Sequence, residues 1–216
     1  MESINVLYFF PYEITNKNHG NITRAIQLLE YFTSRPDKIS IDFVTQEHKD
    51  IENEPSLLKK MFPELNSFFL QRKYSKKNHL KYFIKSKIPS LLDKKKQKKY
   101  HTHIKSPTTL FEKQEFNKLL KKKQYDCIII SYVYFAPLIR NNPYVGNAKL
   151  IIDTHDFMTA LNKKKKSFSL GPAFEEEMKI LNEFDNVWAI SSDELYLFSQ
   201  FAAKAEHSFV PVMYEN

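Results

Sequence analysis

The sequence predicts an α/β protein built on an open parallel sheet of about six or seven strands, with helices on both faces. Short runs rich in β-branched and aromatic residues alternate with longer segments of helical period along the 216 residues, which is typical of such a sheet. Several of these runs are apolar almost throughout, as strands buried on both faces must be. Hydrophobic residues make up 42% of the chain, which supports a single domain over residues 1–216.

Seven short segments have the composition of strands. They lie near 4–10, 39–44, 67–70, 127–131, 149–153, 187–190 and 208–212. In an open parallel sheet, ligands bind beyond the carboxyl ends of the strands. The residues that directly follow each strand are therefore the first candidates for a site.

The clearest helix runs from Ile22 to Phe32, where apolar residues recur at spacings of three and four. Arg24 and Glu30 are expected on its solvent side. Further helices are expected near 110–123, 173–183 and 192–203, with Ser191 or Ser192 as the N-cap of the last. The acidic run at 175–177 would suit a helix N-terminus, so we assign it no catalytic role.

Composition limits the cellular setting. The single cysteine, Cys127, lies in an apolar run and reads as a buried structural thiol that fits a reducing compartment. We find neither a secretory signal pattern nor an apolar stretch long enough for a membrane span. We therefore expect a cytoplasmic protein.

The net charge of +8 comes from one local segment. Residues 72–105 contain 13 Lys and Arg residues and one acid, Asp93, so the remaining residues carry 20 basic and 24 acidic side chains. Because the excess is local and accompanies no recognised nucleic-acid-binding module, we expect no nucleic-acid partner.

A candidate ligand loop follows the first expected strand. Residues 11–18 lead into His19, Gly20 and Asn21, which open the first helix. Glycine lets a backbone pass close to a ligand, and free amides at a helix N-terminus favour an anion. A glycine that merely permits a turn remains the alternative, because the other glycines of a dinucleotide-binding fingerprint are missing.

A histidine between two carboxylates follows the fifth expected strand, in the sequence Asp153-Thr154-His155-Asp156. Neighbouring carboxylates can orient an imidazole and raise its basicity, so His155 is a candidate base or hydrogen-bonding group. Metal ligation or capping of the following turn are the alternatives. The close pair His101 and His103 lies in the basic segment, and its spacing does not tie it to His155.

Together these segments resemble the N-terminal domain of GT-B glycosyltransferases of family 4, the large retaining family. The resemblance covers Pro11 and the turn at 19–21 with Arg24 after it, then Asp-Thr-His-Asp at 153–156. It continues through the acidic helix into the segment 184–194. Asn21 stands where the family's turn has a second glycine.

This resemblance implies a Rossmann-like domain that contributes the acceptor side of a sugar-transfer cleft. His155 would be catalytic and lie beside the transferred sugar, without a protein nucleophile. A nucleotide sugar would be the donor, a glycan or lipid-linked molecule the acceptor, and no metal or other cofactor is expected. The implied substrate-binding residues are His19, Gly20, Asn21, Arg24, Asp153 and Asp156.

The resemblance ends at Val210-Pro211-Val212, where such enzymes cross into their C-terminal, donor-binding domain. We therefore expect this chain to lack that domain and to be inactive alone. A nucleotide-sugar 2-epimerase on the same scaffold, or a complete non-catalytic binding module, are the rival interpretations. Cell-surface polysaccharide synthesis in a bacterium is the expected setting.

The basic segment at 72–105 is interpreted as a helical insertion. Within 78–99, lysines mix with an apolar stripe that includes Leu80, Phe83 and Ile84. Such a stretch can lie on an anionic membrane surface, at about 1 kcal/mol per lysine near the surface. The alternative is a helical hairpin packed on the domain with a solvated lysine face.

Overall fold

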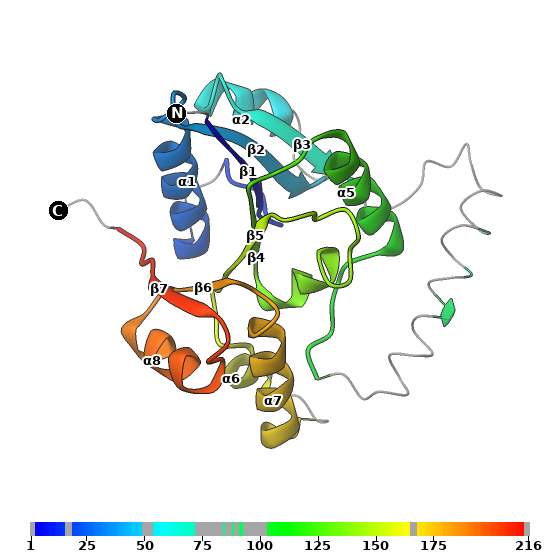
Figure 1. The fold of residues 1–216 in the computed structure, drawn as a ribbon, viewed down its shortest axis with the longest axis vertical. Helices are drawn as coiled ribbons and strands as arrows, with labels where there is room; N and C mark the ends of the chain where they lie inside the picture. Colours follow the sequence, from blue (N-terminus) through cyan, green and yellow to red (C-terminus); the bar gives the residue numbers. More distant parts are fainter. Residues whose placement is uncertain are drawn as a thin grey trace.

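The computed structural model describes residues 3–15, 19–48, 54–71, 84, 88, 91–92, 103–164 and 168–213. These residues form a seven-stranded parallel sheet in the order β3-β2-β1-β4-β5-β6-β7 (Figure 1). The strands are β1 (Ile4–Phe9), β2 (Ile39–Gln46), β3 (Asn66–Leu70), β4 (Cys127–Ser131), β5 (Lys149–Asp153), β6 (Asn186–Ala189) and β7 (Glu206–Phe209). The predicted fold class is confirmed: the chain is a Rossmann-like α/β domain.

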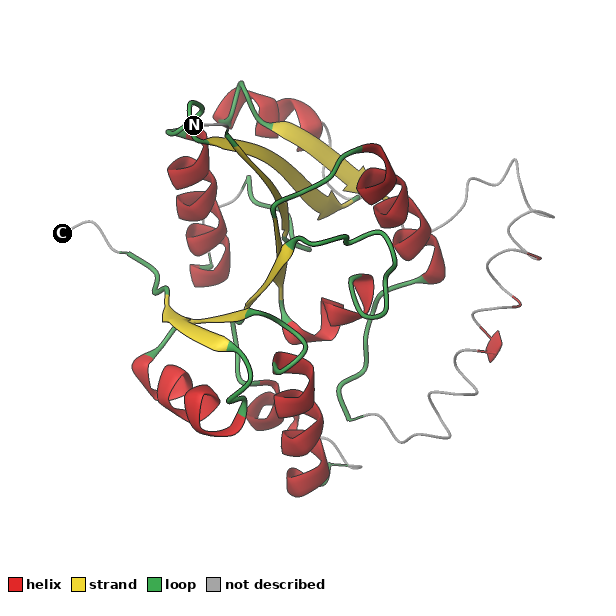
Figure 2. Cartoon of the chain, viewed as in Figure 1, coloured by secondary structure: helices red, strands yellow, loops and turns green. Residues whose placement is uncertain are grey.

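Helices cover both faces of the sheet, as the ribbon coloured by secondary structure shows (Figure 2). The described helices are α1 (Gly20–Thr33), α2 (Glu54–Met61), α5 (Leu110–Lys122), the 3-10 helix η3 (Val133–Leu138), α6 (Met158–Asn162), α7 (Leu170–Leu181) and α8 (Ser192–Phe201). No helix among these described residues is both long and apolar enough to cross a bilayer.

The strand order creates a switch point between β1 and β4. From β1 the chain moves outward in one direction through β2 and β3, then returns to β4 and moves the other way to β7. Crossovers of opposite direction place their helices on opposite faces, because each parallel crossover is right-handed. The connections that leave the carboxyl ends of β1 and β4 therefore run in opposite directions. They leave a crevice between these two strand ends, which is where such sheets bind ligands.

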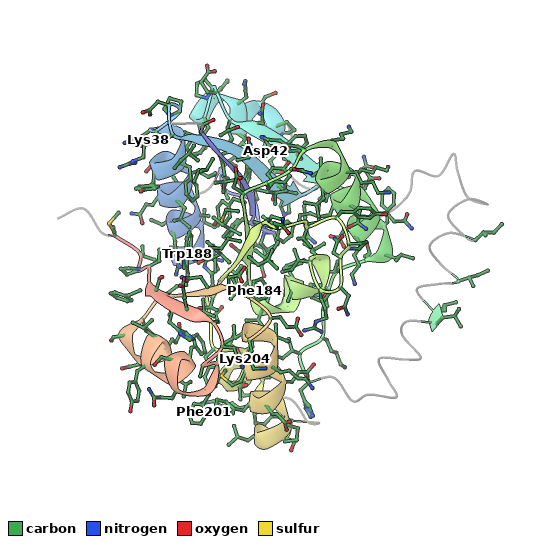
Figure 3. The ribbon with its side chains drawn as sticks, viewed as in Figure 1. Lys38, Asp42, Phe184, Trp188, Phe201 and Lys204 are labelled. Carbon is green, nitrogen blue, oxygen red and sulfur yellow. The ribbon has the colours of Figure 1, made fainter. Side chains whose placement is uncertain are left out.

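The central strand β1 is buried on both faces. Tyr8 points to the α1 side, where its ring lies 6.4 Å from that of Phe32. Phe9 points to the other side and packs edge-on against Phe116 of α5 and Phe135 of η3, at ring distances of 6.3 and 4.9 Å. Side chains of this kind fill the layers between the sheet and its helices (Figure 3). This two-sided packing explains why the buried part of the strand, residues 6–9, consists of apolar and aromatic residues.

Helix ends follow from identifiable caps. Thr109 and Glu112 form a capping box at the start of α5, in which each side chain accepts a hydrogen bond from the other residue's backbone N–H. Ser191 caps α8 by accepting from the backbone N–H of Glu194 at 3.2 Å. The structure thus selects Ser191 over Ser192 as the N-cap.

Three expectations need correction. Helix α7 begins at Leu170, so the acidic run at 175–177 lies beyond its first turn. Within that run, Glu177 is fully buried and accepts hydrogen bonds from the backbone N–H groups of Met158 and Thr159, so it caps α6. The last strand begins two residues earlier than expected.

The third correction concerns Arg24, which was expected on the solvent side of α1. The structure buries it, with 1% of its surface exposed. The predicted insertion at 72–105 lies largely outside the described residues. Within it, Ile84, Ile88, Leu91 and Leu92 are exposed.

Candidate functional site

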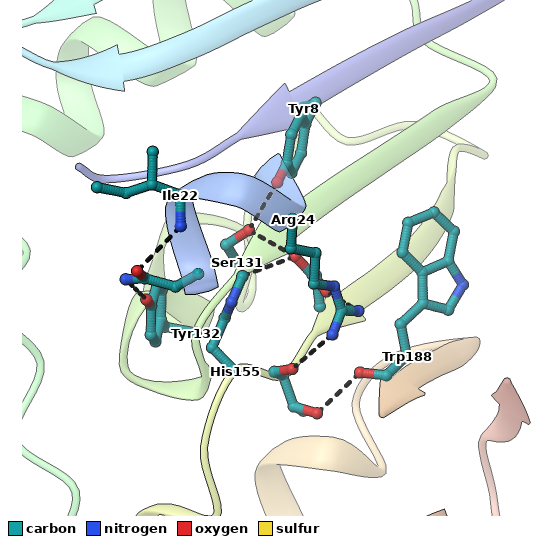
Figure 4. Close-up of polar contacts among 10 residues, drawn as sticks. Tyr8, Ile22, Arg24, Ser131, Tyr132, His155 and Trp188 are labelled. Carbon is teal, nitrogen blue, oxygen red and sulfur yellow. Dashed lines mark hydrogen bonds and ion pairs between the residues drawn. The ribbon is translucent and has the colours of Figure 1, made fainter. Parts of the chain in front are cut away.

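The candidate site lies at the switch point, where the carboxyl ends of β1, β4 and β5 meet the start of α1. Tyr132 directly follows β4, and its hydroxyl accepts a hydrogen bond from Asn21 Nδ2 at 2.7 Å. His155 follows β5 and stacks on the ring of Tyr132. Two segments more than a hundred residues apart are thus joined through one tyrosine (Figure 4).

Asp153 is the centre of a buried polar network. Its carboxylate is fully buried and forms an ion pair with Arg24. Its Oδ2 atom accepts from the hydroxyl of Ser131 at 3.0 Å and lies 2.8 Å from His155 Nε2. Burial alone would raise the pKa of Asp153, but the His155 and Arg24 charges and the hydrogen bonds outweigh it and hold this pKa below its usual value.

Arg24 is held inside the domain rather than at its surface. Besides its ion pair with Asp153, its Nη1 atom lies 3.5 Å from the backbone oxygen of Thr154. The backbone N–H and the hydroxyl of Thr154 both donate to the carbonyl of Trp188 on β6, at 2.9 and 2.8 Å. The network therefore ties α1 to the ends of β5 and β6 (Figure 4).

The His155 ring is held at its Nε2 edge by Asp153 and packs against two aromatic rings. Asp153 accepts from the Nε2 edge, so the Nε2 atom carries a proton. Tyr132 stacks on one face at 4.4 Å between ring centroids, with an interplanar angle of 21°. Phe10 approaches at 5.6 Å with an angle of 58°. Since Nε2 is committed to Asp153, the Nδ1 atom is the nitrogen available to a ligand.

A cavity of about 440 Å³ opens beside this network. It is lined by Tyr12, Glu13, His19, Asn21, Ile22 and His48. The Tyr12 ring meets Tyr132 edge-on at 5.3 Å, so the cavity adjoins the aromatic cluster that holds His155. Its size and its mixture of aromatic and polar groups suit a small polar ligand.

A second cavity, of about 490 Å³, lies at the opposite ends of the strands. It is lined by residues that precede β4 and β5, among them Tyr125, Asp126 and Tyr144. None of the predicted site residues lines it. The first cavity is therefore the one that matches the sequence analysis.

Several solved structures of glycosyltransferases have the same architecture. Sucrose-phosphate synthase from Thermosynechococcus elongatus matches with a TM-score of 0.57 and 12% identity, over 96% of this chain and 48% of that chain. The chain has the fold of a GT-B glycosyltransferase domain. No family model and no curated protein matches the sequence.

Two further GT-B structures extend the comparison. UGT2 of Phytolacca americana, complexed with UDP-2fluoro-glucose and pterostilbene, matches with a TM-score of 0.56 and 8% identity over 99% of this chain and 54% of that chain. Anabaena HepE, in complex with UDP and glucose, matches with a TM-score of 0.51 and 10% identity over 96% and 44%. The chain spans about half the length of these structures.

In this GT-B-type domain, the start of α1 departs from the expected turn. His19 is the N-cap residue, and its side chain makes no capping bond. Gly20 and Asn21 are the first helical residues, and neither has a positive φ. A Cβ at Gly20 would meet nothing within 4 Å. The fold therefore does not require glycine here, and any need for it must come from a ligand.

The predicted residues fall into two groups. His19 and Asn21 line the cavity, whereas Arg24 and Asp153 form the buried pair that supports His155. Asp156 is exposed just beyond it, where partial desolvation raises its pKa despite the opposing charge of His155. Among the described residues, no three His, Cys, Asp or Glu side chains are grouped so as to hold a metal ion.

The sequence analysis missed Ser131 and Tyr132 at the end of β4. Ser131 is the last residue of the predicted strand and Tyr132 directly follows it, so the rule that pointed to residues after strands could have found Tyr132. Ser131 is fully buried and Tyr132 is 4% exposed. Polar side chains buried at a strand end need partners, and here those partners are Asp153 and Asn21.

Proposed function

We propose that this chain is the N-terminal, acceptor-side domain of a retaining, family 4-like glycosyltransferase. The enzyme transfers a sugar from a nucleotide-sugar donor to a glycan or a lipid-linked acceptor. The observation that carries this proposal is the meeting of His155 with the start of α1 at the switch point of a GT-B-type sheet. The likeness to structures solved in complex with UDP and with UDP-2fluoro-glucose supports it.

The proposed roles follow from position and chemistry. The Nδ1 atom of His155 contacts the sugar being transferred, while Asp153 orients the ring through Nε2. Asp156 lies at the exposed rim of the site. His19, Gly20 and Asn21 line the cleft near the donor phosphates or the acceptor, where a helix N-terminus favours negative charge. Arg24 acts indirectly, by holding Asp153.

The remaining half of the cleft would come from a C-terminal domain outside these 216 residues. We place the enzyme in bacterial cell-surface polysaccharide synthesis, at the cytoplasmic face of the membrane. The basic stretch at 78–99 offers the peripheral contact, since its described apolar residues Ile84, Ile88, Leu91 and Leu92 are all exposed. Their spacing of four, three and one matches one face of a helix beside the surrounding lysines.

The direct test uses the complete gene product with a panel of nucleotide sugars. Replacing His155 with alanine should lower sugar transfer by at least about a hundredfold, the usual scale for a positioned acid–base or polar group. His207→Ala is the matched control, because His207 lies on the edge strand β7, two strands from β5. Unchanged transfer by the His155→Ala enzyme removes this residue from the site.

Retention is tested on the same reaction. The anomeric configuration of the product, read by NMR, should equal that of the donor, and an inverted product contradicts the family 4-like assignment. Epimerisation or hydrolysis of the donor without any acceptor requirement would favour the 2-epimerase interpretation instead.

Gly20 offers a test that separates folding from binding. Because a Cβ there meets nothing within 4 Å, Gly20→Ala should leave stability unchanged or raise it by up to about 1 kcal/mol. If a ligand approaches this backbone, the same substitution should weaken nucleotide-sugar or acceptor binding. The affinity is measured by calorimetric titration of the Gly20→Ala enzyme. If this enzyme is stable and binds the nucleotide sugar and the acceptor with unchanged affinity, the start of α1 is not part of the binding site.

A further inference from the structure

Tyr132 has a backbone conformation that tyrosine rarely adopts. Its φ is 68° and its ψ is 128°, well away from the left-handed helical region that asparagine and glycine visit. The other described non-glycine residue with a positive φ is Asn141, an ordinary residue for such a position. A bulky side chain is kept at Tyr132 although glycine would fit its backbone more easily.

The surrounding structure holds this conformation at both of its peptide groups. The backbone N–H of Tyr132 donates to the carbonyl of Asp153 on β5 at 3.0 Å. Its carbonyl accepts from the N–H of Phe135 at 2.9 Å, which begins η3. Strain that is fixed in this way clusters at functional sites, so an observed outlier justifies a search for its use.

The position of the Tyr132 ring indicates what this backbone conformation is for. The ring lies nearly parallel to the imidazole of His155, 4.4 Å away, and is itself 4% exposed. Its hydroxyl accepts from Asn21, so the same side chain touches the start of α1. Tyr12 and Tyr134 pack against it and exchange a hydrogen bond of 2.7 Å between their own hydroxyls.

We propose that Tyr132 is a positioning residue for His155. Its strained backbone sets the phenol ring against the imidazole, and this contact, together with Asp153 at Nε2 and Phe10 on the ring, leaves a single ring orientation with Nδ1 available. The hydroxyl of the same ring contacts Asn21 at the helix start that lines the cavity. This inference rests on the proposed function of the site.

The first test needs no enzymatic activity and uses this chain. A stacked phenol shifts the His155 ring protons upfield, so their NMR signals should move downfield in Tyr132→Leu and stay in place in Tyr132→Phe. Tyr196→Leu is the matched control, because Tyr196 lies on α8 with 70% of its surface exposed. Unmoved His155 signals in a folded Tyr132→Leu protein overturn the proposal.

The second test asks whether the backbone of Tyr132 is strained, and its measurement is the melting temperature. Tyr132→Gly and Tyr132→Ala leave nearly the same cavity, but only the glycine relieves the backbone, so Tyr132→Gly should have the higher Tm of the two. Asn141→Gly, at the other described positive φ, should leave Tm nearly unchanged. A Tyr132→Gly protein that melts below Tyr132→Ala shows that the backbone is unstrained and overturns this part of the inference.

The third test uses the complete enzyme. Tyr132→Leu should lower kcat about 10- to 100-fold with little change in KM, because a misplaced catalytic group costs rate rather than binding. Tyr132→Phe, which keeps the stacked ring, should stay within about threefold of the unmodified enzyme. An equal loss in both variants would show that the hydroxyl, not the ring, matters and would overturn the stacking role.

These outcomes separate the two proposals. If His155→Ala leaves transfer unchanged while Tyr132→Leu moves the His155 signals, the proposed function fails and the ring contact stands. If His155→Ala abolishes transfer and Tyr132→Leu changes neither the signals nor kcat, the proposed function stands and the positioning role fails.

Discussion

Replacing Arg24 with methionine should remove a large part of the stability of this domain. Methionine keeps much of the length and volume of the arginine stem, so the lost guanidinium charge dominates the effect. The carboxylate of Asp153, which has no exposed surface, would then keep Ser131 and His155 as partners but lose its permanent cation. Removing one partner of a buried pair costs about 3–5 kcal/mol.

That cost is substantial because the total free energy of unfolding of a domain is about 5–15 kcal/mol. For a chain of this length, each kcal/mol lowers Tm by about 2–4 °C. The matched control is Arg140→Met, because Arg140 pairs with Glu183 at 2.6 Å on the surface. Exposed pairs of this kind contribute about 0–1 kcal/mol.

A double variant isolates the charge interaction. Arg24→Met combined with Asp153→Leu removes both charges of this buried pair, although Ser131 and His155 lose a hydrogen-bond acceptor at about 1 kcal/mol each. The double variant should therefore be more stable than Arg24→Met alone, and the two single effects should not add. Purely additive effects, or a loss below about 1 kcal/mol for Arg24→Met, would refute this account of Asp153.

Urea denaturation followed by tryptophan fluorescence is the assay. Trp188 is the single tryptophan of the chain, and its backbone carbonyl accepts two hydrogen bonds from Thr154, next to Asp153. Its emission therefore reports on the strand that borders the network. Equal m-values for the variants would show that the difference in midpoint is a difference in stability.

The same pair gives a pH dependence with a defined sign. The pKa of Asp153 is lowered in the folded chain, because the effects of His155 and Arg24 outweigh the opposing effect of burial. Its contribution is therefore present above the unfolded pKa, about 3.9, and is lost as pH falls through the folded pKa. The gap in stability between the unmodified chain and Arg24→Met should narrow as pH falls below about 4.

Two further predictions concern folding outside the network. Burial opposes protonation of His48, but the hydrogen bond and charge of Glu54 outweigh it and raise the pKa of His48. Both ring nitrogens face acceptors, Glu54 and the Pro11 carbonyl, each at 3.0 Å. The stability lost in His48→Ala should thus be largest below pH 6.5 and shrink as pH rises through the folded pKa, and a pH-independent loss in urea titrations would contradict this. Thr109→Ala removes the capping box of α5 and should cost about 0.5–2 kcal/mol, whereas no loss in the same assay would show that the cap is dispensable.

The sheet could be predicted from the sequence because each strand carries its own signal. Segments such as 127–130 are apolar on both faces, and a strand between two helical layers needs that composition. The predicted strand positions agree with the observed ones to within about two residues at most ends. The short helices α2, η3 and α6 were missed, because five to eight residues carry too little periodicity to distinguish a helix from a loop.

The site could be predicted only to the level of its location. The rule that ligands bind after strand ends placed His155 and the start of α1 on one edge, and the structure brings them together there. The burial of Arg24 could not be foreseen, because helical periodicity assigns it to solvent and its partner lies 129 residues away. The role of Tyr132 was equally hidden, since nothing in a tyrosine signals a positive φ.

Two features of this domain that reduce its stability lie at the same place. A fully buried ion pair and a strained tyrosine backbone converge on His155. An apolar core of similar volume would be at least as stable as the ion pair, and a glycine would relieve the strain. In the capping box of α5 and the two-sided burial of β1, by contrast, local propensity and packing agree. Features that reduce stability and gather at one edge of a sheet indicate a functional site. Here the buried ion pair and the Tyr132 backbone both orient the imidazole of His155.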